Sequence, residues 1–342
     1  MGWVALVWVG CRARLAGLLN ISTGGGLYRG CIILGVYAII LPWVGHPKRP
    51  EERTMQQTRK TIEQAIKSNW KAIQAKAGTH PVDLPGSLTL LGSSAKLEKG
   101  KGVAGSDKYA PAILYLQPAH SAFTNGTTTL CKWAGTCKAV CLASFTGRMI
   151  FAGNNRARQW KTALYIGAPQ LFHALLCLDI EKHARRATAA GLIPAVRFDG
   201  GSDTGRGLAL ARLYPAVAFY DYTKSTGRCL SVAKRQAAGQ LSNYTLAYSY
   251  NETTTPWALE KLTAAGCLIA AVTPRNIKKG EPCPDSISLA PLPVIDGDKH
   301  DILPVHAAAK GKGAAWLALG FKQARDRPAA LVAGLKSGFI VE

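Results

Sequence analysis

Three of the nine cysteines lie within eleven residues, in the segment CKWAGTCKAVC, and their thiols are suited to metal chemistry. Cys131, Cys137 and Cys141 have the spacing C-x5-C-x3-C and follow an apolar run at 113–116 that predicts a short buried strand. Soft thiolate ligands suit iron–sulfur clusters and zinc. A [4Fe-4S] cluster on three thiolates leaves one iron open to a small molecule, whereas structural zinc needs a fourth ligand, for which His120 is nearest. Three small core residues in a Gly- and Ala-rich loop are the third interpretation.

A glycine pair follows the next predicted strand, in the segment VRFDGGSD at 196–203. Because glycine has no Cβ, Gly200 and Gly201 would let backbone N–H and C=O groups approach a bound molecule closely. The alternative interpretation is an ordinary turn between a strand and a helix. The glycines strengthen the case for a ligand near the cysteines, since both segments follow predicted strands.

Five apolar runs each end near a polar residue. They cover 195–198, 216–220, 245–249, 267–272 and 292–295, and lead into Asp199, Asp221, Glu252, Arg275 and Asp296. Helical patterns at 208–214, 230–238 and 257–265 fill most of the intervals, and 169–190 is typical of a longer helix. This alternation predicts βαβ units. We expect an α/β fold, a partial (β/α)6-type barrel with mostly parallel strands, after an N-terminal helical and irregular extension.

The carboxyl ends of parallel strands are where barrels of this kind carry their chemistry. On this position alone we assign substrate contacts and catalysis to Asp221, Lys224, Glu252 and Asp298. Acidic residues also begin turns after strands without a catalytic role. Carboxylates further suit Mg²⁺, which binds substrate phosphates. A magnesium-dependent phosphoryl-transfer enzyme would use Asp199, Asp203, Asp221 and Asp298.

The charge of the chain favours polyanionic partners. Its 342 residues include 42 Lys and Arg against 20 Asp and Glu, a formal net charge of +22. Such an excess favours nucleic acid or another polyanion. Basic residues around Trp160 suit phosphate contacts and base stacking; they are Arg148, Arg156, Arg158 and Lys161. A non-enzymatic nucleic-acid-binding protein with a structural zinc or iron–sulfur site is therefore an alternative to an enzyme.

Composition divides the chain into three parts. Residues 1–54 form an apolar extension, for which there are three interpretations: a weak membrane anchor through residues 27–45, a core-packed segment, or non-native sequence upstream of Met55. The uncharged stretch 31–45 is shorter than the ~20 residues of a spanning helix. Residues 55–104 predict an amphipathic helix and a linker, and residues 105–342 the α/β domain. Sparse cysteines, odd in number, favour a reducing cytoplasm.

The chain from about residue 110 to its end resembles the phage gene product 88 domain family. The resemblance rests on the segments CKWAGTCKAVCLASFTGR (131–148), RARQWKT (156–162), VRFDGGSD (196–203), FYDYTK (219–224), NYTLAYSYNE (243–252), VIDGDKHD (294–301) and GLKSGF (334–339). It implies a phage or prophage origin and hence the host cytosol as the place of action. It indicates the boundaries of the domain and names no activity.

The chain also resembles, more loosely, the radical S-adenosylmethionine enzymes, which place a three-cysteine loop after the first strand of a partial barrel and a Gly-Gly-Glu motif after the second. This resemblance implies [4Fe-4S] on Cys131, Cys137 and Cys141, with S-adenosylmethionine as the second cofactor. The cofactor contacts that it implies are Gly200, Gly201, Ser202, Asp203 and Ser249. Ser202 stands where that motif has its glutamate, and Ser249 or Glu252 would lie near the ribose.

Overall fold

The computed structural model describes residues 50–93, 108–118, 123–124, 128–142, 147–276, 280–311, 313–322 and 328–342. The chain divides into two compact units, 1–58 and 59–342, and the sheet lies in the second. The apolar stretch at 27–45, with its predicted membrane anchor, lies outside the described residues. None of the helices in the described ranges is both long and apolar enough to cross a bilayer.

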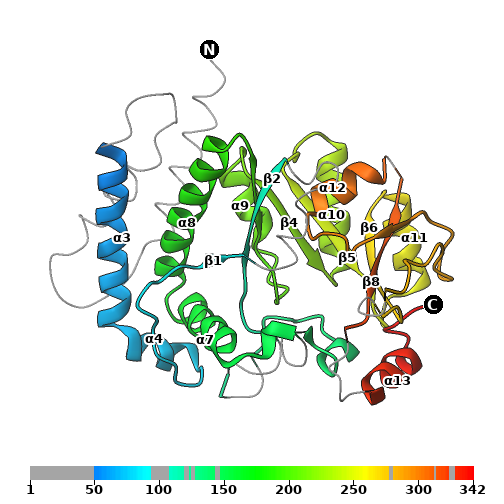
Figure 1. The fold of residues 1–342 in the computed structure, drawn as a ribbon, viewed down its shortest axis with the longest axis horizontal. Coiled ribbons are helices and arrows are strands. Elements are labelled where there is room, and N and C mark those ends of the chain that lie inside the picture. The colour runs from blue at the N-terminus through cyan, green and yellow to red at the C-terminus, as the bar shows by residue number, and fades with distance from the viewer. Residues whose placement is uncertain are drawn as a thin grey trace, which may run out of the picture. The chain divides into compact units, whose positions relative to one another are not determined.

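An eight-stranded sheet forms the core, in the order β1-β2-β3-β4-β5-β6-β8-β7 (Figure 1). β1 pairs antiparallel with β2, and every other pair is parallel. The strands are β1 (Leu91–Gly92), β2 (Tyr109–Leu114), β3 (Ile193–Arg197), β4 (Ala218–Thr223), β5 (Tyr244–Ser249), β6 (Leu268–Thr273), β7 (Val294–Asp296) and β8 (Ala315–Gly320). The predicted α/β fold with mostly parallel strands is confirmed. The sheet does not close into a barrel, because β1 and β7 stand at its two edges.

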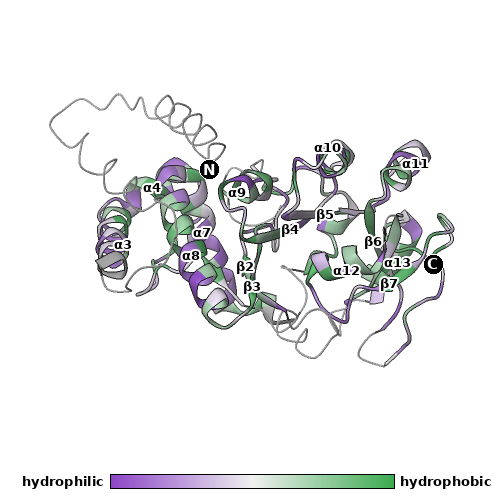
Figure 2. Ribbon diagram, turned by 90° about the horizontal axis from the view of Figure 1, so that it is seen from above, coloured by the Kyte–Doolittle hydropathy of each residue, from purple (hydrophilic) through white to green (hydrophobic). Residues whose placement is uncertain are grey.

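Helices cover both faces of the sheet. Figure 2 shows α9, α10 and α11 in a row along one face and α12 on the other. The helices are α3 (Pro50–Ser68), α4 (Trp70–Ala77), α7 (Ala152–Gly167), α8 (Pro169–Ala189), α9 (Gly207–Leu213), α10 (Thr226–Ala237), α11 (Pro256–Ala264), α12 (Leu303–Ala309) and α13 (Pro328–Ser337), with short 3₁₀ turns at Thr136–Lys138 and Gly147–Ile150. The helices predicted from 55, 169, 208, 230 and 257 are confirmed.

Local sequence explains where the helices between the strands begin. Ser225 and Thr255 stand before α10 and α11, and each hydroxyl accepts the N–H three residues later, which satisfies a donor that the helix leaves unpaired. Pro256 occupies the first turn of α11, where no N–H is needed. These caps fix the points at which the chain turns from the end of a strand into a helix.

The two faces of the sheet bury separate apolar clusters because strand side chains alternate. Leu317 of β8 packs with Leu303 of α12 on one face. Its neighbour Trp316 packs with Leu262 of α11 on the other. The sheet is therefore buried on both sides, and its accessible chemistry lies at the ends of the strands.

A buried carboxylate joins the N-terminal helices to α8. Asp179 accepts hydrogen bonds from Arg59 Nη1 at 2.7 Å, from the Leu90 N–H at 2.6 Å and from the Leu91 N–H at 3.2 Å. Its side chain is 4% exposed. Because these donors come from α3 and from the segment that leads into β1, Asp179 fixes both against α8.

Removing this carboxylate should destabilise the fold. We expect Asp179→Ala to lower the free energy of unfolding by about 3 kcal/mol, since it leaves a half-buried guanidinium and two N–H groups without their acceptor. Glu63→Ala is the control, because Glu63 also pairs with Arg59 but is 20% exposed, and should cost under about 0.5 kcal/mol. Equal losses in urea unfolding would contradict the role given to Asp179.

Candidate ligand site at the carboxyl edge of the sheet

The parallel strands all end at one edge of the sheet, which we call the carboxyl edge. The segments that follow them hold the predicted site residues. In open α/β sheets this edge is where ligands bind. The segments are 115–118 after β2, 198–206 after β3, 224–225 after β4, 250–255 after β5, 274–276 after β6, 297–302 after β7 and 321–322 after β8.

The glycine pair packs against β2. The Gly200 N–H donates to Leu114 O at 3.0 Å, and a Cβ at Gly200 would lie 2.7 Å from the same oxygen. A Cβ at Gly201 would lie 3.3 Å from Leu116 O. Close backbone packing against β2 therefore accounts for Gly200 on its own, without a bound molecule.

Asp199 organises the loop that follows the glycines. Its carboxylate accepts hydrogen bonds from the hydroxyls of Ser202 at 2.7 Å and Thr204 at 2.9 Å, and from the N–H groups of Thr204 and Gly205, both at 3.0 Å. Asp199 is buried, and so is Ser202. The predicted contact residue Ser202 thus holds the loop carboxylate.

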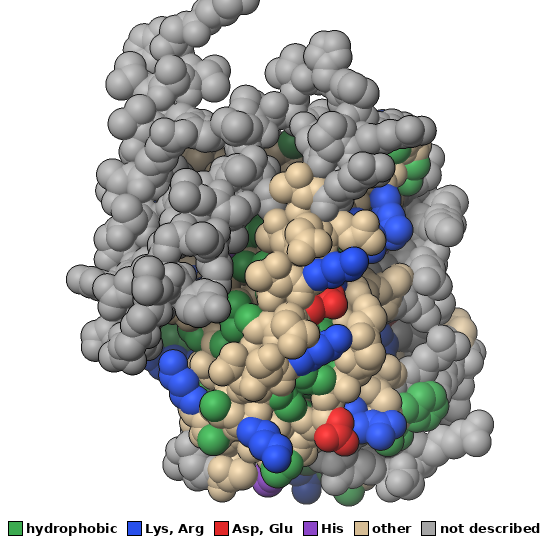
Figure 3. All heavy atoms as spheres, turned by 90° about the vertical axis from the view of Figure 1, so that its left-hand side faces the viewer, with side chains coloured by type: hydrophobic (Ala, Val, Ile, Leu, Met, Phe, Trp, Pro, Cys, Tyr) green, Lys and Arg blue, Asp and Glu red, His purple; other side chains and the backbone are tan. Residues whose placement is uncertain are grey.

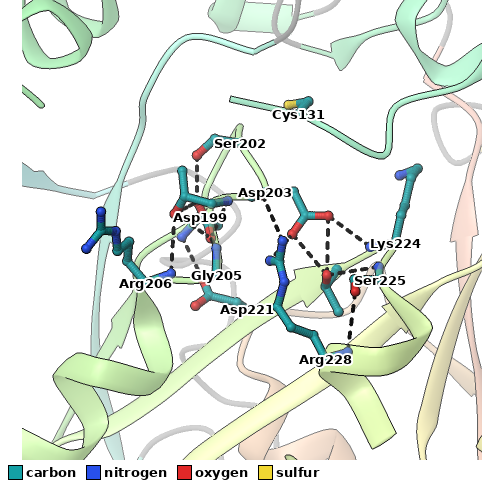
Figure 4. Close-up of polar contacts among 12 residues, drawn as sticks. Cys131, Asp199, Ser202, Asp203, Gly205, Arg206, Asp221, Lys224, Ser225 and Arg228 are labelled. Atoms are coloured by element: carbon teal, nitrogen blue, oxygen red, sulfur yellow. Dashed lines mark hydrogen bonds and ion pairs between the residues drawn. The ribbon is translucent and has the colours of Figure 1, made fainter. Parts of the chain in front are cut away.

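Asp203 joins the loop after β3 to the start of α10. Its carboxylate accepts from Thr223 Oγ1 at 2.9 Å, from the Lys224 N–H at 3.0 Å and from Arg228 Nη1 at 2.7 Å. Figure 4 shows this group of contacts, with the Lys224 side chain extending away from Asp203. Asp203 therefore neutralises Arg228. It contacts the backbone N–H of Lys224 and forms no ion pair with the Lys224 ammonium.

Asp221 lies beneath the same loop and is 1% exposed. It accepts the Asp199 N–H at 2.6 Å and the Tyr244 hydroxyl at 3.1 Å. Burial, reinforced by the neighbouring Asp199 carboxylate, raises the pKa of Asp221 well above its usual range. These contacts give the Asp221 carboxyl a role in holding the loop.

The acidic residues after β7 are also bonded to the fold. Arg275 donates to Asp296 at 2.7 Å and to Asp298 at 3.0 Å, and Asp298 accepts the Gly320 N–H at 2.6 Å. Asp301 pairs with Arg197 at 2.6 Å. Asp298, predicted as a substrate contact, thus ties the ends of β6 and β8 together.

The metal hypotheses can be compared with these positions. Among the residues that the structure describes, no three His, Cys, Asp or Glu side chains are grouped so that they could hold a metal ion. Cys131, Cys137 and Cys141 are all described, whereas His120 is not. The described positions therefore give no support to the iron–sulfur, zinc or Mg²⁺ hypotheses, which stay predictions.

The segment 131–142, which we call the cysteine loop, is attached to the carboxyl edge at two points. Cys131 Sγ donates to Gly201 O at 3.7 Å, and the Thr136 N–H donates to Glu252 Oε1 at 2.6 Å. A Cβ at Gly135 would overlap that same glutamate oxygen, so the contact requires glycine. The loop therefore lies against the segments that follow β3 and β5.

Four side chains meet where the cysteine loop contacts the ends of β4 and β5. Lys224 Nζ donates to Ser249 Oγ at 3.2 Å. Burial raises the pKa of the Cys137 thiol, the nearby Lys224 ammonium opposes that shift, and Glu252 reinforces it. The structure thus brings together Lys224 and Glu252, which were predicted from their positions after two different strands, and Ser249, which the looser family resemblance implied.

Sequence reasoning gave no role to two polar residues on the strands themselves, Arg197 of β3 and Tyr220 of β4. Arg197 lies over the Tyr222 ring, 4.6 Å from its centroid, on the sheet face that also carries Tyr220 and α12. Ser249 shares this face with Ala247, since alternate residues of a strand point the same way. The feature of the sequence that could have identified Arg197 is its charge, since it is an arginine inside the otherwise apolar run 195–198.

The basic cluster around Trp160 lies mostly on α7 and is partly buried. Arg158 and Trp160 are buried, and Arg158 donates to Gln117 Oε1 and Met149 O. Lys161 donates to Leu90 O, and burial lowers its pKa to about 8. These side chains support α7 from within, while the side chain of Arg148 lies outside the described residues. Arg156 is exposed, so these contacts account for only part of the cluster, and its nucleic-acid interpretation stays a prediction.

Comparison with known proteins gives one match. A protein-family model described as Gene product 88 matches residues 88–332, which includes all eight strands of the sheet. No curated protein and no solved structure matches the chain. The matched range contains every residue of the carboxyl edge discussed above.

The protonated state of Asp221 gives a pH prediction. Its pKa is raised in the folded chain and ordinary in the unfolded one, so the stability it contributes is full below about pH 4 and is lost as pH rises through the raised pKa. Asp221→Asn carries no charge; its amide oxygen accepts the Asp199 N–H, and its amide nitrogen can donate to the Tyr244 hydroxyl oxygen. We therefore expect the unfolding free energy of the wild type, relative to this variant, to fall as pH rises.

Thermal or urea unfolding of both proteins between pH 4 and pH 9 measures this difference. Asp221→Ala is the control for the hydrogen bonds themselves and should be about 1–3 kcal/mol less stable than Asp221→Asn at every pH. A difference between wild type and Asp221→Asn that stays constant, or that grows in favour of the wild type as pH rises, would show that the carboxyl is ionised in the fold.

Proposed function

The chain belongs to the gene product 88 family, and from the site that this family's domain contains we propose that the protein binds a small anionic molecule at the carboxyl edge. Lys224 and Ser249 hold the anionic group. The cysteine loop lies beside it, through its contacts with Glu252 and Gly201. The ligand is of the metabolite class, with a carboxylate or phosphate.

The observation that carries this proposal is a concentration of unsatisfied polar atoms. Among the described residues, six buried side-chain nitrogen or oxygen atoms have no hydrogen-bond partner, and five belong to β3, β4 or the segments after β5 and β6. They are Arg197 Nε, Tyr220 OH, Tyr222 OH, Glu252 Oε2 and Arg275 Nε. Folded proteins keep few such atoms, and a cluster of them is explained by a bound molecule or by ordered water.

The charge of the ligand follows from the pairing of the cations. Near the ends of β3, β4 and β6, Arg197, Arg228 and Arg275 each pair with an aspartate within 4.0 Å. Lys224 bonds to a hydroxyl and has no carboxylate within that distance in the described part of the chain. A half-buried ammonium without a counter-ion attracts an anion.

S-adenosylmethionine is cationic overall, because it carries a sulfonium and an ammonium, but its carboxylate and ribose hydroxyls are groups that this site would bind. Its carboxylate would bind Lys224, and Ser249 and the tyrosine hydroxyls offer partners for hydroxyl groups. The proposal does not depend on a metal, since the thiols as placed do not form a metal-holding group.

Loss of the ammonium should weaken binding. We expect Lys224→Gln to bind S-adenosylmethionine, AMP or pyrophosphate about tenfold more weakly than the wild type, since a charge-assisted hydrogen bond contributes about 1.5–3 kcal/mol. Lys234→Gln is the control, because Lys234 is an exposed lysine of α10. The measurement is isothermal titration calorimetry. Two results would contradict the proposal: Lys224→Gln binds as tightly as the wild type, or the wild type binds none of the three probes.

Metal content tests the cysteine loop separately. From the described positions we expect protein purified without oxygen to hold less than one iron, sulfide or zinc per chain. Elemental and acid-labile sulfide analysis measures this. A stoichiometric cluster that is lost in Cys131→Ser, Cys137→Ser and Cys141→Ser would show that the loop rearranges around a metal and would restore the iron–sulfur hypothesis.

A further inference from the structure

We propose that the outward face of α3 and α4, from Lys60 to Lys71, binds the sugar–phosphate backbone of a nucleic acid. Lys60, Lys67 and Lys71 are exposed, and none forms an ion pair among the described residues. Figure 3, which looks onto the side of α3 and α4, shows Lys and Arg side chains spread along it and few Asp or Glu. We call this surface the lysine face.

Helical geometry places Lys60 and Lys67 on one stripe of α3. Their spacing of seven residues returns them to the same side of that helix, with the exposed Gln64 between them. The exposed Lys71 follows at the start of α4, after the break in the helix at Asn69. Ile62, a buried residue, points to the opposite side, toward the domain core. Lys60 and Lys67 lie about 10 Å apart along the axis, which is the rise of about three nucleotides.

The nearby acidic residues do not neutralise this face. Arg59 pairs with Glu63 at 2.9 Å and with Asp179 at 2.7 Å. Glu63 and Asp179 thus both pair with Arg59, the cation that helps to hold α3 against α8, and not with the three lysines. The lysines of the lysine face are exposed and form no ion pair among the described residues, so the electrostatic potential on this side of the helices is positive.

The chemistry of the face favours nucleic acid over an anionic membrane. Peripheral helices that bind membranes insert large apolar side chains beside their basic residues. The exposed large apolar residues of the described chain include none between 59 and 77. Lysines act as point charges that contact phosphates, and the face offers no exposed aromatic ring for stacking on bases. The binding should therefore be independent of sequence.

The test compares two triple variants of the full chain that remove the same charge. Lys60→Gln, Lys67→Gln and Lys71→Gln remove the lysine face. Lys182→Gln, Lys234→Gln and Lys261→Gln remove three exposed lysines of α8, α10 and α11. Fluorescence anisotropy with a 20-base-pair DNA of arbitrary sequence, across a range of salt concentrations, measures the affinity and its salt slope; unchanged thermal unfolding shows that both variants fold.

We expect the first variant to bind at least about tenfold more weakly at low salt and to lose about 3 from the slope of log K against log salt, one for each phosphate contact. The control variant should change less than about threefold. Equal losses in both variants would show that only net charge matters. No DNA binding by the wild type, or binding to vesicles of anionic phospholipid instead, would also overturn the proposal. None of these results depends on the ligand at the carboxyl edge.

Discussion

The structure of the carboxyl edge depends on buried carboxylates that bind backbone N–H groups. Asp199 and Asp203 follow β3 and Asp221 lies within β4, and each accepts at least one backbone N–H. Loops at strand ends leave many N–H groups unpaired, and an unpaired buried N–H costs free energy comparable to a lost hydrogen bond. The aspartates remove that cost and fix the shape of the edge at which a ligand would bind.

Because these carboxylates are bound inside the domain, they do not neutralise the basic residues on its surface. In a chain with 42 basic and 20 acidic residues, each aspartate bound inside the domain is one fewer on its surface. Arg59, Arg197 and Arg275 are each neutralised by such aspartates. Lys224 at the carboxyl edge and the lysines of the lysine face are among the cations that form no ion pair in the described part of the chain. This excess of basic over acidic residues supports the proposed binding of a small anion at the carboxyl edge and of a polyanion at the lysine face.

The sequence predicted the fold better than the site. Apolar runs at a βα period identify the parallel sheet, because buried strands need apolar residues on both faces. β8 was missed although AWLALG is such a run, and its insertion between β6 and β7 is set by packing that no local pattern records. Site roles were harder: an aspartate after a strand has the same local sequence whether it binds a ligand or a loop. Lys224 was predicted from its position alone, and Ser249 from the looser family resemblance.

Hydrogen exchange of the loop amides tests this account most directly. The N–H groups of Thr204, Gly205 and Lys224 all bond to Asp199 or Asp203. The account predicts that these three amides exchange slowly and at rates that Mg²⁺ does not change. Exchange as fast as in an unstructured loop, or protection that appears only when Mg²⁺ is added, would show that the carboxylates bind a metal rather than the backbone.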